Sequence, residues 1–521
     1  MSLPKLWTGQ RILALSGLAL IAALQAIAGL CVAAAASRLL LGSSVGNSQN
    51  HLAIIVGAGA CGLVGLRVAE RRWAEAFALG YVTHLRTAFM SHVLRQPIDS
   101  AGTRLGLIMT RVVNDLSAIR LWLSRGIVSI IVALTVFLTI LMYFALTDPT
   151  LARALVITVL FWALFVGLLL YPLFGRIRLS RKRRGRLAIN AAAILTARPS
   201  LLVLGRHGKT MRGFQRQTER LNKALVGRAT YSGGLRASAD LLFPVLTLGL
   251  TVGVLGTDTS AVDAADLTVL IMATGMLGVQ LNALALSAEY KMASAIAFDR
   301  LNRVMRYDAF DLNEGVSPVK RPQGGVSLDA SSIQIEHRSV SFSVGAGEQV
   351  LLSGLSGPET VSLTRQIGRL SEKVTGSLLL DGMDAADISR RDWWRLVTLV
   401  SNDLPLIRGT VAENASLGAS TKLSDTRVVE TLDAFQLDGD ASEMIEAERH
   451  PPDEKTAAAI RAARAVLRQA GLIVVQDHYL VDSPSLLVPL QKLARKRGVT
   501  VLFLLGEGCT LPGVDRTLDL S

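Results

Sequence analysis

The sequence is poor in charged residues, cysteines and aromatic side chains. Only 18% of its 521 residues are charged and 5% are aromatic, whereas 50% are hydrophobic and the mean hydropathy is +0.41. This balance excludes an ordinary soluble enzyme and indicates a large lipid-facing surface. Cys31, Cys61 and Cys509 lie far apart, so no pair has the spacing of a zinc or redox site, and the sequence predicts no metal site of the chain's own.

Long apolar runs are confined to the part of the chain before about residue 290. Runs of roughly 17 or more apolar residues predict membrane-spanning helices. The six candidate spans are residues 12–36, 52–68, 126–146, 150–173, 238–256 and 266–288. The first is too long for the core of a cleaved secretory signal, and we expect it to be retained as a span. The sequence therefore predicts a membrane domain, residues 1–308, followed by a domain of mixed composition.

Acidic residues are nearly missing from one long connection. Residues 173–236 hold 16 Lys or Arg residues and one acid, Glu219, and this excess accounts for the net charge of +14. The connections after the second and fourth predicted spans are long and basic, whereas the other three are short and hold almost no bases. The positive-inside rule places these basic connections and both termini in the cytoplasm. No aromatic platform or groove-reading motif accompanies the bases, so we expect the lipid bilayer, and not nucleic acid, as their partner.

A turn-rich linker, residues 309–325, precedes a second domain at residues 326–521. Short β-like runs alternate there with helical runs, which predicts an α/β fold. The strand-like run from Glu348 to Leu352 leads into Gly354-Leu355-Ser356-Gly357-Pro358-Glu359-Thr360-Val361-Ser362. A strand, a glycine turn and a helix in this order are typical of a phosphate loop, whose backbone N–H groups cradle phosphate oxygens.

Further stretches at matching distances resemble ABC transporters of the exporter type. Residues 104–125, with Arg111 and Asp115, resemble the intracellular helix that follows their first coupling region, and residues 289–308, with Arg300, resemble the helix that leads to their nucleotide domain. Residues 396–418 are similar to their Q-loop region, above all in the run Gly409-Thr410 and Glu413-Asn414. Residues 463–468 and the apolar run 472–475 resemble the signature helix and the Walker B strand. The resemblance implies a half-transporter, in which an α-helical domain of six transmembrane helices is joined to an α/β P-loop NTPase-like cassette.

The positions that this resemblance assigns to nucleotide binding are degenerate. They are Gly354, Ser356, Gly357, Thr360, Ser362, Asn402 and Gln476. Thr360 stands where the family has Lys, Val361 where it has a metal-binding hydroxyl, and Glu359 where it has Gly. Asn402 replaces the Q-loop glutamine, and Gln476 replaces the Asp that orders magnesium.

The catalytic positions implied by the resemblance are changed as well. Asp477 stands at the position of the catalytic Glu, Gly506 at that of the switch His, and residues 452–456 at that of the signature. Because a carboxylate at Glu359 repels a triphosphate, we expect ATP and Mg²⁺, the cofactors implied by the resemblance, to bind poorly. We expect hydrolysis by the chain itself to be weak or absent.

A half-transporter encloses no complete pathway, so the resemblance implies a dimer. We expect a second ABC half-transporter as partner, with a heterodimer favoured over a homodimer, in the inner (plasma) membrane of a bacterium. The alternative is a non-transporting pseudo-ATPase that serves as a membrane scaffold or regulator. The substrate and the direction of transport stay open.

Overall fold

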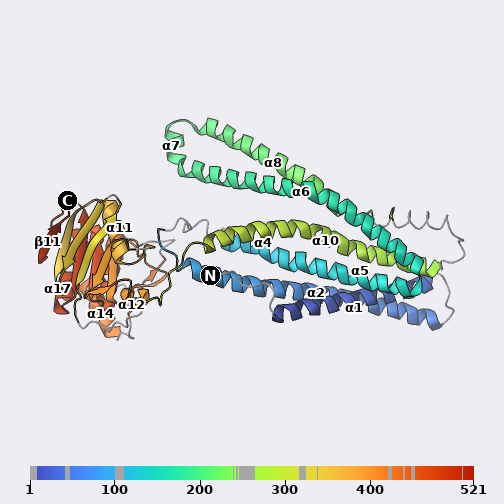
Figure 1. Ribbon diagram of the computed structural model, residues 1–521, viewed down its shortest axis with the longest axis horizontal. Helices are drawn as coiled ribbons and strands as arrows, with labels where there is room; N and C mark the ends of the chain where they lie inside the picture. The colour runs from blue at the N-terminus through green and yellow to red at the C-terminus, as the bar shows by residue number, and fades with distance from the viewer. Residues whose placement is uncertain are drawn as a thin grey trace. The chain divides into compact units, whose positions relative to one another are not determined.

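The computed structural model of the protein is shown in Figure 1. It describes residues 9–40, 47–99, 111–238, 240–241, 244–245, 264–315, 324–336, 338–372, 374–419, 425–437, 441–446, 452–506 and 509–520. The chain divides into two compact units: unit 1 comprises Met1–His92 and Arg104–Arg306, and unit 2 comprises Val93–Thr103 and Tyr307–Ser521. Residues 93–99, which lie within the predicted membrane domain by sequence, thus group with unit 2 by their contacts.

Unit 1 is helical throughout its described part. Its elements are α1 (Gly9–Leu40), α2 (Asn47–Val93), η1 (Arg111–Asp115), α4 (Leu116–Leu121), η2 (Trp122–Ile127), α5 (Val128–Thr147), α6 (Pro149–Thr196), α7 (Arg198–Val203), α8 (His207–Ala237) and α10 (Ala264–Met305). Asp148 starts α6, because its carboxylate accepts a hydrogen bond from the Thr150 backbone N–H at 2.8 Å and Pro149 occupies the first turn.

Within the described residues, five helices are long and apolar enough to cross a membrane. Their candidate membrane segments are Arg11–Leu39, Asn50–Val93, Val113–Thr147, Pro149–Thr196 and Thr268–Met305, and they include four of the six predicted spans and all but the first two residues of the span 266–288. The remaining prediction, residues 238–256, lies almost entirely outside the described residues.

Helix α10 packs against α1, α4 and α5, and α6 packs along α8 in a long antiparallel hairpin with α7 at its tip (Figure 1). An ion pair joins the two stretches whose resemblance the sequence analysis noted. Arg300 of α10 donates to Asp115, the last residue of η1, at 3.3 Å. Asp115 has only 9% of its side chain exposed, so the contact fixes two segments that lie 185 residues apart in sequence.

Unit 2 is an α/β cassette. Its strands are β1 (Leu328–Ile335), β2 (Arg338–Val344), β3 (Gln349–Leu355), β4 (Ser377–Leu380), β5 (Met383–Asp384), β6 (Val397–Ser401), β7 (Gly409–Thr410), β8 (Met444–Ile445), β9 (Leu472–Gln476), β10 (Thr500–Gly506) and β11 (Arg516–Asp519). Its helices are α11 (Gly357–Ile367), α12 (Arg390–Leu396), α13 (Val411–Ser416), α14 (Asp425–Ala434), α15 (Glu454–Leu467), α16 (His478–Asp482) and α17 (Pro484–Lys496).

The main sheet of unit 2 is parallel, in the order β11-β3-β10-β9-β6. Its central strands are continuous apolar runs, as expected of strands that are covered on both faces. An antiparallel sheet, β2-β1-β4-β5, adds a second layer, and β7 and β8 form a short pair. Because the main sheet is parallel, the carboxyl ends of β3, β10, β9 and β6 lie along one edge, where ligands bind in sheets of this type.

Candidate functional site

The carboxyl edge of the parallel sheet collects most of the predicted site residues. The loop after β3 carries Ser356, β9 ends at Gln476, and β10 ends at Gly506. The strand register pairs Gly506 with Leu355 and Ser401 with Gln476, so the neighbouring strands end together. The structure thus brings the predicted phosphate loop, Walker B and switch positions to one edge.

The predicted phosphate loop has the expected backbone. Gly354 has a φ of +77°, which favours glycine, and Ser356 is the N-cap of α11. The hydroxyl of Thr360, at the lysine position, donates to the Gly357 carbonyl at 2.7 Å, and Thr360 is fully buried. The Thr360 hydroxyl is therefore bonded within its own helix, and Thr360 offers no charge to a ligand.

The N-terminus of α11 is occupied by a carboxylate of the same chain. The backbone N–H and the hydroxyl of Ser356 donate to Glu359 Oε2 at 2.8 and 2.7 Å. A helix N-terminus with free N–H groups is the feature that binds phosphate, and a carboxylate is an equally suitable anion there. These hydrogen bonds, aided by the charge of Arg338, hold the pKa of the Glu359 carboxyl below its usual range.

Arg338 of β2 fixes this carboxylate from the other side. Its Nε lies 2.9 Å from Glu359 Oε1, and its guanidinium also donates to the carbonyls of Gly354 at 2.5 Å and Leu520 at 2.8 Å. Arg338 thereby joins β2, the phosphate loop and the last described residue of the chain. The residues present do not fit a bound triphosphate, because Glu359 accepts both Ser356 donors, and its charge, held in place by Arg338, lies where the phosphates would have to sit.

The predicted Q-loop and magnesium positions are no better suited to a metal-bound nucleotide. Asn402 is exposed in the turn after β6. The side-chain carbonyl of Gln476, at the position of the magnesium-ordering Asp, accepts a hydrogen bond from Ser401 at 2.8 Å. A neutral amide that is already hydrogen-bonded is a weak substitute for the oxygen anions that Mg²⁺ prefers.

Asp477, the position of the catalytic Glu, forms a buried ion pair. Arg461 of α15 donates from Nε to Asp477 Oδ2 at 2.9 Å, and its Nη2 lies 2.7 Å from the same oxygen. Asp477 has 1% of its side chain exposed and Arg461 has 7%. The other carboxylate oxygen accepts from the Leu480 backbone N–H at 3.3 Å and caps α16. A carboxylate held by these donors is badly placed to take a proton from water.

The helix at the signature position is also capped by its own chain. Asp453 is the N-cap of α15, and its Oδ1 accepts from the Thr456 backbone N–H at 3.3 Å. The two helix N-termini that the resemblance assigns to phosphate contacts, those of α11 and α15, therefore each carry a carboxylate of the chain itself. Gly506 ends β10 and offers no side chain for the switch contact, and His478 is exposed at the start of α16.

The residues that match the family's Q-loop region form hydrogen bonds within the cassette. Thr410 and Glu413 form a capping box, in which the Thr410 N–H donates to Glu413 Oε2 at 2.8 Å and the Glu413 N–H donates to Thr410 Oγ1 at 3.1 Å. Asn414 is fully buried and hydrogen-bonds both backbone groups of Ile407 at 2.9 Å. Arg464 of α15 donates to the Asn414 carbonyl at 2.9 Å, and burial lowers the pKa of Arg464 to about 10.

Arg365 links the phosphate-loop helix to two other segments. Its guanidinium makes two hydrogen bonds to Asp403, at 2.6 and 3.0 Å, and one to Asp99 at 2.9 Å. Asp99 belongs to residues 93–99, which also contact the cassette through the Ile98 N–H and the Leu370 carbonyl at 3.1 Å. The hydrogen bonds that Arg365 donates to Asp403 raise the pKa of the Arg365 guanidinium, which stays charged. This three-way contact joins residues far apart along the chain and was not predicted from the sequence.

Replacing Arg365 with Ala is expected to weaken the contact of residues 93–99 with the cassette. The side chains of Arg365 and Asp403 are about a quarter exposed and that of Asp99 about half, so solvent screens the pairs and we expect a loss of about 1 kcal/mol. Hydrogen–deuterium exchange should rise in residues 95–99 and in the turn at Asp403. Arg395→Ala, which removes an exposed pair with Asp392, is the control and should leave both segments unchanged. Equal exchange in both variants would contradict the link.

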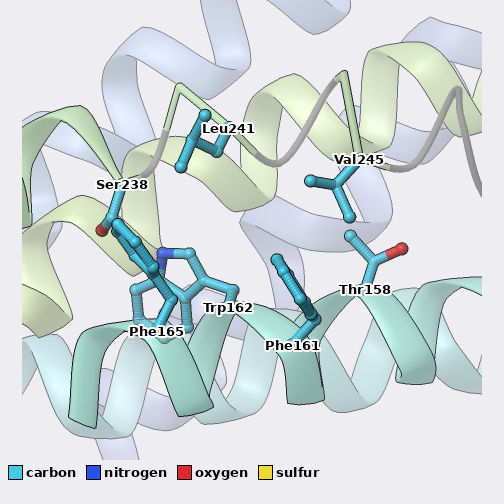
Figure 2. Close-up of a pocket in the computed structure, with 7 residues that line it drawn as sticks. All are labelled: Thr158, Phe161, Trp162, Phe165, Ser238, Leu241 and Val245. Atoms are coloured by element: carbon cyan, nitrogen blue, oxygen red, sulfur yellow. The ribbon is translucent and has the colours of Figure 1, made fainter. Parts of the chain in front are cut away.

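A small apolar cavity lies in unit 1 between α6 and the residues that follow α8 (Figure 2). Its volume is about 10 Å³, which is room for a single water-sized sphere and too small for a substrate. It is lined by Thr158, Phe161, Trp162, Phe165, Ser238, Leu241 and Val245.

Comparisons with known proteins identify the family of the membrane region and a solved structure with the same fold. The sequence model of the ABC transporter transmembrane region matches residues 15–281. The structure superposes on that of a bacterial Atm1-family ABC exporter with ATP bound, with a TM-score of 0.80 and 16% identity, over 98% of this chain and 93% of the other. The predicted fold class, a helical exporter-type membrane domain with an α/β cassette, is confirmed.

Two groups of curated relatives are similar in sequence. The mycobactin import ATP-binding/permease protein IrtA of Mycolicibacterium thermoresistibile is 22% identical over 408 residues, 73% of this chain and 44% of the relative. The ATP-dependent lipid A-core flippase of Ralstonia nicotianae is 30% identical over 138 residues, 23% of each chain. The chain thus spans less than half the length of these relatives.

Proposed function

The chain belongs to the ABC transporters through its transmembrane region, and from this premise we propose that it is a half-transporter whose own cassette neither binds nor hydrolyses ATP productively. The carboxylate that occupies the phosphate loop carries this proposal. Glu359 takes both Ser356 donors and is held by Arg338, so a triphosphate would have to displace an anion that is part of the chain. Asp477 is bound to Arg461 and cannot serve as the general base.

We further propose that the chain works with a different half-transporter. In this family each ATP site combines the phosphate loop of one subunit with the signature of the other, and this chain has altered both. A homodimer would therefore contain two degenerate sites. A partner with intact motifs would still face the altered signature helix of this chain, whose N-terminus is capped by Asp453, and we expect it to hydrolyse ATP slowly.

The proposed role of this subunit is to supply half of the translocation path and a rigid docking surface. The preserved contacts support this role, because the capping box at Thr410 and the buried Asn414 keep the cassette's shape without serving a nucleotide. The names of the relatives include an importer and a lipid flippase, and a lipid-like substrate fits the apolar spans. The same contacts also fit the alternative, a non-transporting pseudo-ATPase scaffold.

Nucleotide labelling of the reconstituted protein separates these functions. The full chain is purified alone and together with the ABC half-transporter encoded nearest to it, and each sample is exposed to photoreactive ATP in proteoliposomes. We expect no label on this chain, and ATPase activity only in the pair, abolished when the partner's own catalytic Glu is replaced by Gln. A pair without ATPase activity and without an ATP-dependent conformational change would favour the scaffold. Hydrolysis by this chain alone would refute both functions.

A further inference from the structure

A cleft rich in arginine lies between α6 and α8 of unit 1. Its volume is about 670 Å³, within the range of roughly 300 to 1,000 Å³ typical of small-molecule sites. The residues that line it are Arg183, Arg186, Ile189, Asn190 and Ala193 of α6, and Gln217 and Arg220 of α8. None of these lining residues is acidic.

The helical repeat brings these side chains to facing surfaces. On α6, Arg186 follows Arg183 by three residues and precedes Asn190 by four, which places all three on one face. On α8, Gln217 and Arg220 are likewise three residues apart. Two hydrogen bonds hold the arms together: Arg183 Nη1 donates to the Arg220 carbonyl at 2.5 Å, and Asn190 Nδ2 donates to Gln217 Oε1 at 3.0 Å.

The positive charge in this cleft is not balanced locally. No carboxylate in the described part of the chain forms an ion pair with Arg183, Arg186 or Arg220, whereas Arg228 on the same α8 pairs with Glu289 of α10 at 2.7 Å. Glu219 is the one acid of the surrounding stretch and does not line the cleft. Guanidinium groups gathered without counter-ions repel one another, and a bound anion would remove that repulsion.

We propose that this cleft binds a phosphate-bearing small molecule. Arginine presents a planar fork of donors that matches phosphate oxygens in two-point contacts, and Arg183, Arg186 and Arg220 converge on one cavity. Ile189 and Ala193 line the same cleft and provide an apolar surface for the organic part of the ligand. This site goes beyond the proposed function and does not depend on transport.

The phosphate group could come from a phospholipid headgroup or from a free metabolite. The cleft residues of α6 begin ten residues beyond residue 173, the predicted end of the fourth span. At 1.5 Å per residue this is a distance of about 15 Å along the helix, which favours a free, water-soluble ligand.

Titration of inorganic pyrophosphate into the full chain tests the site. The chain is reconstituted in nanodiscs of neutral phosphatidylcholine at physiological salt, and binding is measured by calorimetry. We expect saturable binding of one pyrophosphate per chain, weakened at least about tenfold in Arg183→Gln/Arg220→Gln. Because Arg183 also joins the two helices, the single variant Arg186→Gln is measured too and should weaken binding about threefold or more.

A double variant that removes two arginines outside the cleft controls for nonspecific electrostatic attraction of pyrophosphate. Arg198 and Arg212 are exposed on the same helical hairpin and do not line the cleft, so Arg198→Gln/Arg212→Gln should change the affinity less than twofold. Equal weakening by both double variants, or no saturable binding to the unaltered chain, would overturn the proposal. Repeating the titration in nanodiscs of phosphatidylglycerol distinguishes the two sources of the phosphate group. If lipid headgroups bind in the cleft, they will compete and lower the affinity of the unaltered chain for pyrophosphate. If the natural ligand is a free metabolite, this affinity will stay the same.

Discussion

Arg461→Ala is expected to destabilise the cassette by about 3 to 5 kcal/mol, because it leaves the carboxylate of Asp477 buried without its counter-charge. Asp477 has 1% of its side chain exposed and cannot regain hydration without local unfolding. Hydrogen–deuterium exchange of the full chain measures the effect, since amides of β9 and α15 exchange through the larger openings of the cassette. Their protection should fall by the equivalent free energy.

Two further variants separate the buried pair from general effects of charge. Arg461→Met/Asp477→Leu removes both charges and should recover most of the lost stability, because apolar side chains replace a buried ion pair at little cost. Arg495→Ala breaks a pair with Asp515 in which both side chains are about half exposed, and we expect a loss of at most about 1 kcal/mol. If Arg461→Ala lowered the free energy of unfolding no more than Arg495→Ala does, the buried carboxylate of Asp477 would not require Arg461 as its counter-charge.

Rebuilding the phosphate loop should restore nucleotide binding. In Glu359→Gly/Thr360→Lys/Val361→Ser the internal anion is removed, and a lysine and a metal-binding hydroxyl take their family positions. We expect ATP to bind at least about tenfold more tightly than to the unaltered chain, equivalent to about 1.4 kcal/mol. Equilibrium dialysis of radiolabelled ATP against the full chain measures this directly.

The position of the Glu359 carboxylate leads to a specific prediction for the phosphate-loop variants. Thr360→Lys alone should gain little affinity, because Glu359 still occupies the helix N-terminus and would also pair with the new lysine. Adding Asp477→Glu to the rebuilt loop should not give hydrolysis, since Arg461 would hold the longer carboxylate too. Tight ATP binding by the unaltered chain, equal to that of the rebuilt loop, would show that Glu359 does not exclude nucleotide.

Much of the fold could be predicted from the sequence, because membrane spans and buried parallel strands have strong local signals. Five predicted spans lie in helices long and apolar enough to cross a bilayer. The strand, turn and helix around Gly354 follow from an apolar run and a glycine, and each depends on neighbouring residues alone. The replaced positions, such as Thr360 for Lys, could likewise be identified by spacing from this turn.

The partners of the site residues could not be predicted in the same way. Arg338 lies 21 residues before Glu359 and Arg461 lies 16 residues before Asp477, on different elements in each case. One signal was available for the second pair: Arg461 stands in an alanine-rich run, which favours burial, and a buried charge requires a partner. Arg338 sits on a half-exposed strand, and nothing in its surroundings marks it.

The sequence by itself determined that this chain is a membrane protein with an exporter-type layout and that other residues stand at the positions matching the family's nucleotide motifs, since composition and spacing are properties of the chain. Only the tertiary structure decided what replaced those functions. Glu359 fills the helix N-terminus with Arg338, and Asp477 is neutralised by Arg461, because folding places charges from separate elements within 3 Å of each other. An ion pair depends on distance in space, and distance along the chain does not report it.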